Sequence, residues 1–211
     1  NKTSEYLSKE KAIGWFQGRM EFGPRALGGR SILGDPRSEK MQKNLNLKVK
    51  FRESFRPFAP SILESDLSNW FELDIKSPYM LLVASIKSNK KIEMSEKEKN
   101  LFGIEKLNIK RSEIPAVTHV DYSARIQTVN KETNKRYYDL ISKFKEKTGC
   151  PVLVNTSFNV RGEPIVNTPT DAFNCFMGTE LDYLIIGNCI LDKTKQNKSL
   201  KKNYSKKIEL D

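Results

Sequence analysis

The sequence predicts an α/β fold in which helices flank a sheet, because apolar runs of strand length alternate with segments of helical periodicity. The longest apolar run covers residues 79–86 and is typical of a strand whose two faces are both covered. The clearest helix covers residues 134–148, where large apolar side chains recur on one face. Gly149 follows this helix at the position where a C-terminal cap belongs.

The first part of the chain is expected to begin with a buried strand at residues 12–16. Pro24 is expected in the first turn of a helix, so that the loop before it directs backbone N–H groups towards a ligand. Ser38 is expected to cap a helix that carries Met41 and Leu45 on one face.

The remaining elements are predicted from similar local patterns of apolar runs, turn residues and caps. In chain order they are a loop with Pro57 and Pro60, a strand at 61–63, a short helix at 66–73, strands at 117–120 and 124–129 around a turn at 121–123, a strand at 151–154, a helix at 169–177 capped by Thr168, and a strand at 181–186.

Positive charge is concentrated at the two ends of the chain, within a net charge of +11. Residues 1–60 hold 13 Lys and Arg against 6 Asp and Glu, and residues 193–211 hold 7 against 2. The terminal stretch is expected to be a disordered, Lys-rich tail, and the mixed charges of residues 87–113 indicate an exposed insertion. Residues 1–192 are therefore expected to form one domain.

Composition favours an intracellular chain that is not embedded in a membrane. No apolar run approaches the roughly 20 residues that a membrane span requires. Cys150, Cys175 and Cys189 form no close-spaced pair, which suits a reducing compartment, and they are expected to be small core residues. The sequence begins at Asn1 without a signal region, so we expect a cytoplasmic protein with a further domain upstream.

Three polar motifs, at residues 18–28, 48–57 and 155–164, combine cations with glycines and aromatic side chains. Guanidinium forks and ammonium groups are the chemistry that holds polyphosphates. Solvated surface charge is the alternative, but the neighbouring phenylalanines favour a buried anion site. The cations in and beside these motifs that could supply such groups are Arg19, Arg25, Arg30, Lys50, Arg52, Arg56 and Arg161.

Four motifs in the same order resemble the C-terminal domain of O-carbamoyltransferases of the nodulation-protein and antibiotic-biosynthesis type. The resemblance covers about residues 12–191, and its motifs lie at residues 14–37, 55–60, 119–129 and 155–166. It implies a YrdC-like fold with a twisted mixed sheet and flanking helices. It also implies formation of carbamoyl-adenylate from carbamoyl phosphate and ATP, after which an N-terminal metal-binding domain of the same polypeptide transfers the carbamoyl group to an alcohol. That second domain is absent from this chain.

The Lys-x-Arg and Ser-x-Asn signature that this resemblance implies matches Lys50-Phe51-Arg52 and Ser157-Phe158-Asn159. Mg²⁺ is expected to bridge the phosphates of ATP, without a metal site made by this chain. The residues expected to act in catalysis are Lys50, Arg25 and Arg56. Those expected to bind substrate or nucleotide are Arg19, Arg30, Arg52, His119, Asp121, Arg125, Asn155, Ser157, Asn159 and Arg161.

Several alternatives stay open at this stage. His119 is either a satisfied structural residue or a site residue, and Asp121 would help to hold a cation or a ribose. Asn155 either ends its strand or contacts the ligand, and Ser157 either binds ligand oxygens or caps a turn. The alternative function is a nucleotide-binding or RNA-binding module without catalysis, although no aromatic RNA-stacking motif favours nucleic acid.

Two positions depart from the family pattern. Gly29 stands where the family usually has Asn, which removes a side-chain hydrogen-bonding group beside the arginines. Tyr122 stands where the family pattern has Gly, which is expected to change a turn.

Overall fold

A single eight-stranded sheet organises the molecule in the computed structural model, which describes residues 1–107 and 109–202. The strand order is β4-β5-β3-β6-β2-β1-β7-β8. The pairs β1–β7 and β3–β5 are parallel and the other neighbours are antiparallel, so the sheet is mixed. The strands are β1 Ile13–Phe16, β2 Arg30–Gly34, β3 Ala59–Leu63, β4 Leu82–Ser85, β5 Ser123–Val129, β6 Val152–Ser157, β7 Tyr183–Ile186 and β8 Cys189–Asp192.

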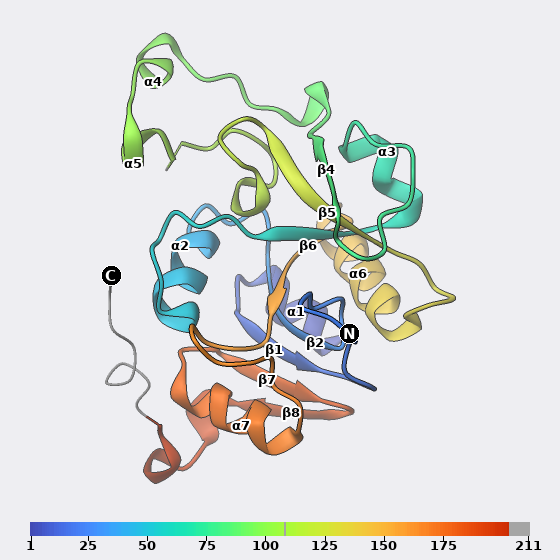
Figure 1. Ribbon diagram of the computed structural model, residues 1–211, viewed down its shortest axis with the longest axis vertical. Helices are drawn as coiled ribbons and strands as arrows, with labels where there is room; N and C mark the ends of the chain where they lie inside the picture. The colour runs from blue at the N-terminus through green and yellow to red at the C-terminus, as the bar shows by residue number, and fades with distance from the viewer. Residues whose placement is uncertain (108, 203–211) are drawn as a thin grey trace.

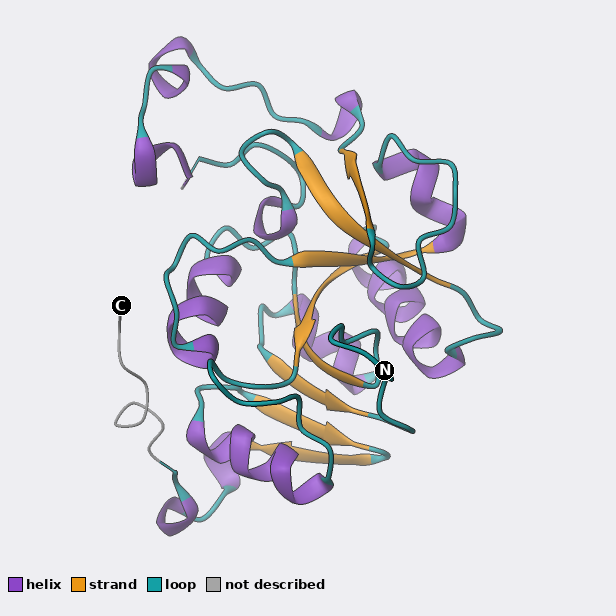
Figure 2. Ribbon diagram, viewed as in Figure 1, coloured by secondary structure: helices purple, strands orange, loops and turns teal. Residues whose placement is uncertain are grey.

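Helices pack against this twisted sheet, which Figure 1 shows with β4 and β5 at its upper end and β7 and β8 at its lower end. The helix α6 packs against β3 and β6, and α7 packs against β1 and β7. The predicted α/β class, with a mixed sheet and flanking helices, is confirmed (Figure 2). The α-helices are α1 Lys2–Ser8, α2 Met41–Leu45, α3 Leu67–Trp70, α4 Glu96–Lys99, α5 Gly103–Leu107, α6 Lys135–Thr148 and α7 Pro169–Gly178.

Elements with strong local signals form where the sequence predicts them. The helix α6 ends at Gly149, whose φ of 74° is the left-handed conformation that glycine favours at a C-terminal cap. Thr168 caps α7 in a reciprocal capping box with Asp171. The strands predicted at residues 12–16, 61–63, 124–129, 151–154 and 181–186 are confirmed with small shifts in their bounds.

The prediction that residues 79–86 form a strand covered on both faces is wrong. The strand β4 is only Leu82–Ser85 and lies at the edge of the sheet, paired to β5 alone among the described strands. Leu81 and Val83 are 69% and 60% exposed. The apolar run gave no information on which strands would lie at an edge.

Three local predictions around the first motifs are also wrong. Pro24 lies in an irregular loop and not in a helix. Ser38 does not cap α2, because its hydroxyl donates to the Glu10 carboxylate at 2.9 Å. Pro60 lies within β3, one residue before the pairing with β5 begins at Ser61.

The sequence prediction also missed or misplaced several elements. Residues 117–120 form the end of a 3₁₀ turn and a loop, not a strand. The helix at 66–73 is shorter than predicted, as α3 ends at Trp70. The strands β2 and β8 and the helix α1 were not predicted. Cys150 and Cys175 are buried as expected, whereas Cys189 is exposed.

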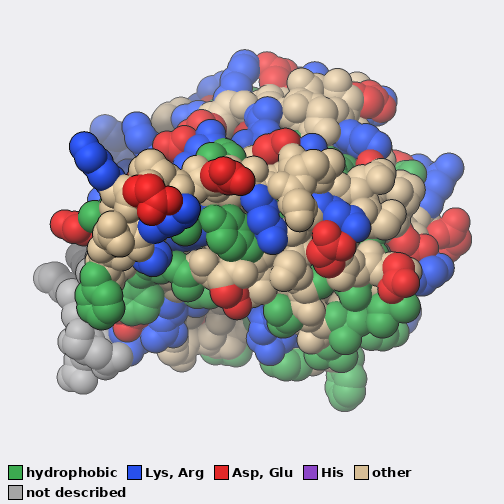
Figure 3. Space-filling model, turned by 90° about the horizontal axis from the view of Figure 1, so that it is seen from above, with side chains coloured by type: hydrophobic (Ala, Val, Ile, Leu, Met, Phe, Trp, Pro, Cys, Tyr) green, Lys and Arg blue, Asp and Glu red, His purple; other side chains and the backbone are tan. Residues whose placement is uncertain are grey.

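Residues 87–113 contain α4 and α5, which extend from the upper end of the molecule (Figure 1). The face of the molecule seen from above carries blue basic and red acidic side chains intermixed, with no continuous basic surface (Figure 3). Residues 193–202 of the predicted tail include two 3₁₀ turns, and residues 203–211 lie outside the described part. No helix in the described residues is long and apolar enough to span a membrane.

Candidate functional site

An unusual backbone segment presents the first cations of the site. The helix α2 continues into a π-helix, Asn46–Lys50, and Phe51 follows with φ 48° in the left-handed region. π-helical turns and non-glycine residues with positive φ both occur preferentially at functional sites, because surrounding contacts must hold them. This geometry lets Lys50 point into the protein and ends the helix before Arg52.

Lys50 joins the two halves of the Lys-x-Arg and Ser-x-Asn signature. Its Nζ donates to Ser157 O at 2.5 Å and to Asn159 Oδ1 at 2.7 Å, with Asn159 O at 3.0 Å and Ser157 Oγ at 3.2 Å. The side chain is 4% exposed. Two segments more than 100 residues apart in the sequence therefore meet at the end of β6.

The charge of Lys50 is held in an unfavourable environment. Burial and, secondarily, the charge of Arg52 lower the pKa of Lys50 to about 7. Burial and the charge of Arg56 lower the pKa of Arg52 to about 10. These three cations thus form a mutually repelling group, the lysine cluster, which a bound anion would stabilise.

Polar contacts within residues 46–56 fix the guanidinium groups of the lysine cluster. Arg52 Nε donates to Asn46 Oδ1 at 2.7 Å, and its guanidinium lies 5.0 Å from the ring centre of Phe58. Arg56 Nε forms an ion pair with Glu53 at 2.8 Å, and the Arg56 side chain is about half exposed. The pKa of Glu53 is lowered by its own backbone N–H and then by the charges of Arg56 and Arg161.

Arg25, His119, Asp121 and Arg125 form a second group, the arginine–histidine cluster. Burial lowers the pKa of Arg125, and the charge of Arg25 lowers it further. Burial also lowers the pKa of His119, although Asp121 opposes this effect. Asp121 Oδ1 accepts hydrogen bonds from Ser123 N at 3.0 Å and Ser123 Oγ at 2.7 Å.

Tyr122, between these residues, has φ 64°, a conformation that glycine adopts freely. Tyr122 therefore adopts a left-handed turn conformation at the position where the family pattern has Gly.

A row of polar side chains on one face of the sheet lies between the two clusters. Asn155 Nδ2 donates to Gln127 Oε1 at 2.8 Å and to Ser61 Oγ at 3.0 Å, across the adjacent strands β6, β3 and β5. Because strand side chains alternate, Asn155 shares its face with Ser157 and Gln127 shares its face with Arg125. The sequence prediction missed Ser61 and Gln127, whose only signal is a polar residue within an apolar strand.

Arg30 is buried, and its Nη donors are used within the protein, while its Nε has no partner among the described residues. Its Nη atoms donate to backbone oxygens of Gln17, Gly18, Gly29 and Asn167 at 3.0–3.4 Å. Its guanidinium also lies 3.5 Å from the ring centre of Phe16. Arg30 therefore ties together the segments on either side of the first motif.

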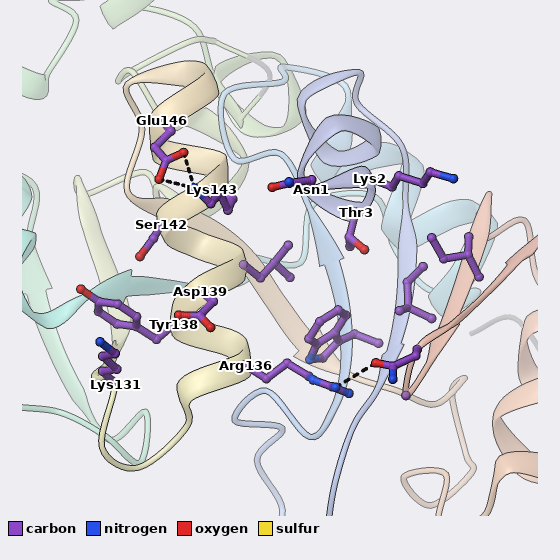
Figure 4. Close-up of a pocket in the computed structure, with 16 residues that line it drawn as sticks. Asn1, Lys2, Thr3, Lys131, Arg136, Tyr138, Asp139, Ser142, Lys143 and Glu146 are labelled. Atoms are coloured by element: carbon purple, nitrogen blue, oxygen red, sulfur yellow. Dashed lines mark hydrogen bonds and ion pairs between the residues drawn. The ribbon is translucent and has the colours of Figure 1, made fainter.

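Arg19 lines a hollow of about 560 Å³ together with Glu21, Tyr79 and Gln127, and none of the other predicted site residues lines it. Another hollow of about 820 Å³ lies between α1 and α6 (Figure 4). Lys143 and Glu146 of α6 form an ion pair in its wall, and Arg136 extends across it. None of the predicted site residues lines this larger hollow.

Comparison with known proteins agrees with the resemblance seen in the motifs. A family model described as "Carbamoyltransferase C-terminus" matches residues 4–193. The Synechocystis protein sll1178 is 58% identical over 100% of this chain, which covers 34% of that protein. The 3'-hydroxymethylcephem-O-carbamoyltransferase of Streptomyces clavuligerus is 34% identical over 88% of this chain and 31% of the enzyme.

Full-length HypF, solved in a phosphate- and nucleotide-bound form, aligns with 81% of this chain and 18% of its own, with 16% identity and a TM-score of 0.47. That likeness carries no weight in the assignment. The chain spans about a third of the length of the two curated relatives named above. By its family model and sequence identity, the chain belongs to the carbamoyltransferase family and corresponds to its C-terminal part.

Proposed function

We propose that this chain forms carbamoyl-adenylate from carbamoyl phosphate and ATP. The observation that carries the proposal is the burial of Lys50 beside Arg52, with both pKa values lowered. Burying like charges together is costly, and polyphosphate binding would offset the cost. Family membership supplies the reaction class, and the two clusters supply cations on one side of the sheet.

The proposed chemistry needs mainly orientation and neutralisation of charge. Atom balance requires one water for each adenylate. In the proposed order, carbamoyl phosphate first loses its phosphate to that water, which yields carbamate. A carbamate oxygen then attacks the α-phosphorus of ATP, and pyrophosphate leaves. One phosphate and one pyrophosphate are thus released for each carbamoyl-adenylate.

Each cluster has a distinct part in this scheme. Lys50 and Arg56 would neutralise charge on the phosphates as the bond to pyrophosphate breaks, and Arg52 would hold their oxygens. Arg25 and Arg125 would bind the anionic carbamoyl donor, with His119 beside them. Ser157 and Asn159 hold the Lys50 ammonium. Asn159 Nδ2 donates one N–H to Glu163 O, and its second N–H would be available to the ligand.

Mg²⁺ would enter the site with ATP. The described residues contain no group of three or more His, Cys, Asp or Glu side chains that could hold a metal ion. Mg²⁺ commonly takes most of its ligands from phosphates and water, so this chain need not provide a cage. When bound, it would supply further neutralisation of the phosphates.

Transfer to an alcohol would require the remainder of a full-length carbamoyltransferase. The chain spans about a third of the two relatives described above, so we expect it alone to form the adenylate without carbamoylating an acceptor. Detection of a carbamoylated alcohol with this chain as the only protein would show that division of labour to be wrong.

Mass spectrometry of a reaction with ATP, Mg²⁺ and carbamoyl phosphate tests the proposal, because it detects carbamoyl-adenylate directly. Saturable binding of ATP without any adenylate would favour the alternative, a nucleotide-binding module without catalysis. Binding of RNA of any sequence that weakens steeply with salt would favour an RNA-binding module.

A further inference from the structure

The loop that carries Arg25 is closed at its base by a single carboxylate oxygen. Glu21 Oε1 accepts hydrogen bonds from the backbone N–H groups of Gly29 at 2.6 Å, Leu27 at 2.8 Å and Arg30 at 3.3 Å. Glu21 begins the loop, and the three donors lie where the chain returns to β2. Bonds to an ionised acceptor are stronger than neutral ones, so this contact is a substantial constraint on the loop.

The returning side of the loop is also tied to the sheet. Asn155 Nδ2 donates to Ala26 O at 3.0 Å, and Gln127 Nε2 donates to Leu27 O at 2.9 Å. Trp15 Nε1 donates to Gly28 O at 2.9 Å. Residues 22–25 project beyond these contacts and are exposed.

Glycine at position 29 makes room for the carboxylate. A Cβ atom added there would lie 2.9 Å from Arg19 O and 3.1 Å from Glu21 Oε1. Both distances are closer than carbon atoms normally approach oxygen. The departure from the family's Asn at this position therefore suits the close contact between Glu21 and the loop.

We infer that Glu21 is a positioning residue that holds Arg25 beside Arg125, an inference that rests on the proposed function. The two guanidinium groups repel each other, and Arg25 has no carboxylate partner within the described part of the chain. A free loop would let Arg25 move away from Arg125. With Glu21 in place, the pair is ordered before an anion binds, so less conformational entropy is lost on binding.

The first experiment measures the loop itself and needs no ligand. We expect Glu21→Ala to raise the amide hydrogen-exchange rates of Leu27 and Gly29 by about 10- to 100-fold, as their acceptor is lost. The amide of Leu33 in β2 should be unchanged. Glu72→Ala, which removes an exposed carboxylate paired with Lys87, should leave all three rates unchanged. Unchanged exchange at Leu27 and Gly29 in Glu21→Ala would overturn the inference.

The second experiment is a double-mutant cycle on carbamoyl phosphate affinity, measured by calorimetry. If Glu21 acts through Arg25, then Glu21→Ala weakens binding several-fold, while Glu21→Ala with Arg25→Ala binds no more weakly than Arg25→Ala alone. Glu21→Gln should restore only part of the affinity, because it keeps Oε1 as an acceptor but loses the charge and places an amide at the buried Oε2 position, which has no partner in the described residues. Independent, additive losses would overturn the inference.

The two experiments separate the inference from the proposed function. If the wild-type chain binds neither carbamoyl phosphate nor ATP, the proposed function fails, and the role of Glu21 towards a ligand fails with it. The exchange experiment would still decide whether Glu21 holds the loop. If the wild-type chain binds carbamoyl phosphate but the losses from Glu21→Ala and Arg25→Ala are additive, only the proposed positioning role of Glu21 is wrong.

Discussion

The segments 17–30 and 46–56 both carry buried and exposed cations, but the charged neighbour of the buried cation is an anion in the first segment and a cation in the second. In the first segment the Nη atoms of the buried Arg30 donate to backbone oxygens, the charge of Glu21 lies near it, and Arg19 and Arg25 are exposed. In the second, the buried Lys50 is the cation placed among other cations, and the exposed Arg56 is paired with Glu53.

Burial alone therefore does not distinguish these two cations. Arg30 and Lys50 are each 4% exposed. Burial lowers both pKa values, but the charge of Glu21 opposes the shift at Arg30, whereas that of Arg52 adds to it at Lys50. A buried cation with a cationic neighbour therefore indicates a site for an anion better than a buried cation does by itself.

The largest expected effect is that of removing the Lys50 charge. Lys50→Met keeps much of the buried stem but deletes the ammonium, so we expect the rate of carbamoyl-adenylate formation to fall by at least about 100-fold. Lys50→Arg should rescue poorly, because a planar fork cannot replace a compact ammonium held by Ser157 and Asn159. The rates are measured by mass spectrometry of the adenylate.

Lys48→Met is the matched control for this prediction. Lys48 lies on the same π-helix, but it is exposed and its Nζ is 3.5 Å from Glu180. It should keep the wild-type rate. Wild-type turnover in Lys50→Met would show that the Lys-x-Arg match carries no function.

Arg30 should matter for folding. Arg30→Ala would leave several backbone oxygens without donors and open a space beside Phe16, so we expect a loss of about 3 kcal/mol in the free energy of unfolding. Urea denaturation measures this change. If Arg30→Ala retains wild-type stability but loses ATP binding, then Arg30 binds ligand as Lys50 is proposed to do, and its expected role in folding is wrong.

Arg25 and Arg56 should matter for binding and little for folding. We expect Arg25→Ala or Arg56→Ala to weaken ligand binding by about 1.5–3 kcal/mol, the range for a hydrogen bond to a charged group. Calorimetry with carbamoyl phosphate and with MgATP provides the test, and urea denaturation provides the control. Unchanged affinity for both ligands in both variants would remove these arginines from the site.

A smaller effect is expected in the dependence of binding on pH. The pKa of Lys50 is about 7 in the free protein, and a bound anion would raise it. Binding should therefore be accompanied by proton uptake above pH 7, and MgATP affinity should fall by up to about tenfold per pH unit as Lys50 loses its proton. Calorimetry in buffers of different ionisation enthalpy measures the proton uptake. Lys50→Met should take up fewer protons on binding, and its MgATP affinity should depend less on pH.

The stability of the free protein should change with pH in the opposite direction. The pKa of Lys50 is about 7 when folded, against an ordinary value of 10.5, so the unfolded chain binds more protons between these values. The free energy of unfolding contributed by this group therefore rises with pH from about 7 towards 10. Lys50→Met should reduce that slope in urea denaturation at pH 7 and pH 9, and an unchanged slope would contradict the lowered pKa.

Local sequence signals predicted the elements that have complete local caps. The helix α6 has its glycine cap and α7 its capping box, so neighbouring residues fix both ends. The position of β4 at the sheet edge depends on which strands pair, which no local pattern contains. The short strand β2 begins with a charged residue, Arg30, whose partners are brought to it only by the fold.

The candidate site was also predicted only where short sequence motifs mark its residues. Its motifs pointed to Lys50, Ser157 and Asn159, which the structure brings into contact. Sequence reasoning treated Arg30 as one more ligand-binding cation, which stays a prediction, and the contacts of its Nη atoms with backbone oxygens are visible only in three dimensions. It gave Glu21 no role, since a lone glutamate in a loop is normally a solvated charge.

Release of pyrophosphate and phosphate by the wild-type chain, measured together, tests the central claim most directly. With ATP, Mg²⁺ and carbamoyl phosphate, we predict equal amounts of the two products, and no pyrophosphate when carbamoyl phosphate is omitted. Pyrophosphate release that does not depend on carbamoyl phosphate, or no release by a folded chain that binds ATP, would contradict the assignment of carbamoyl-adenylate formation to this chain.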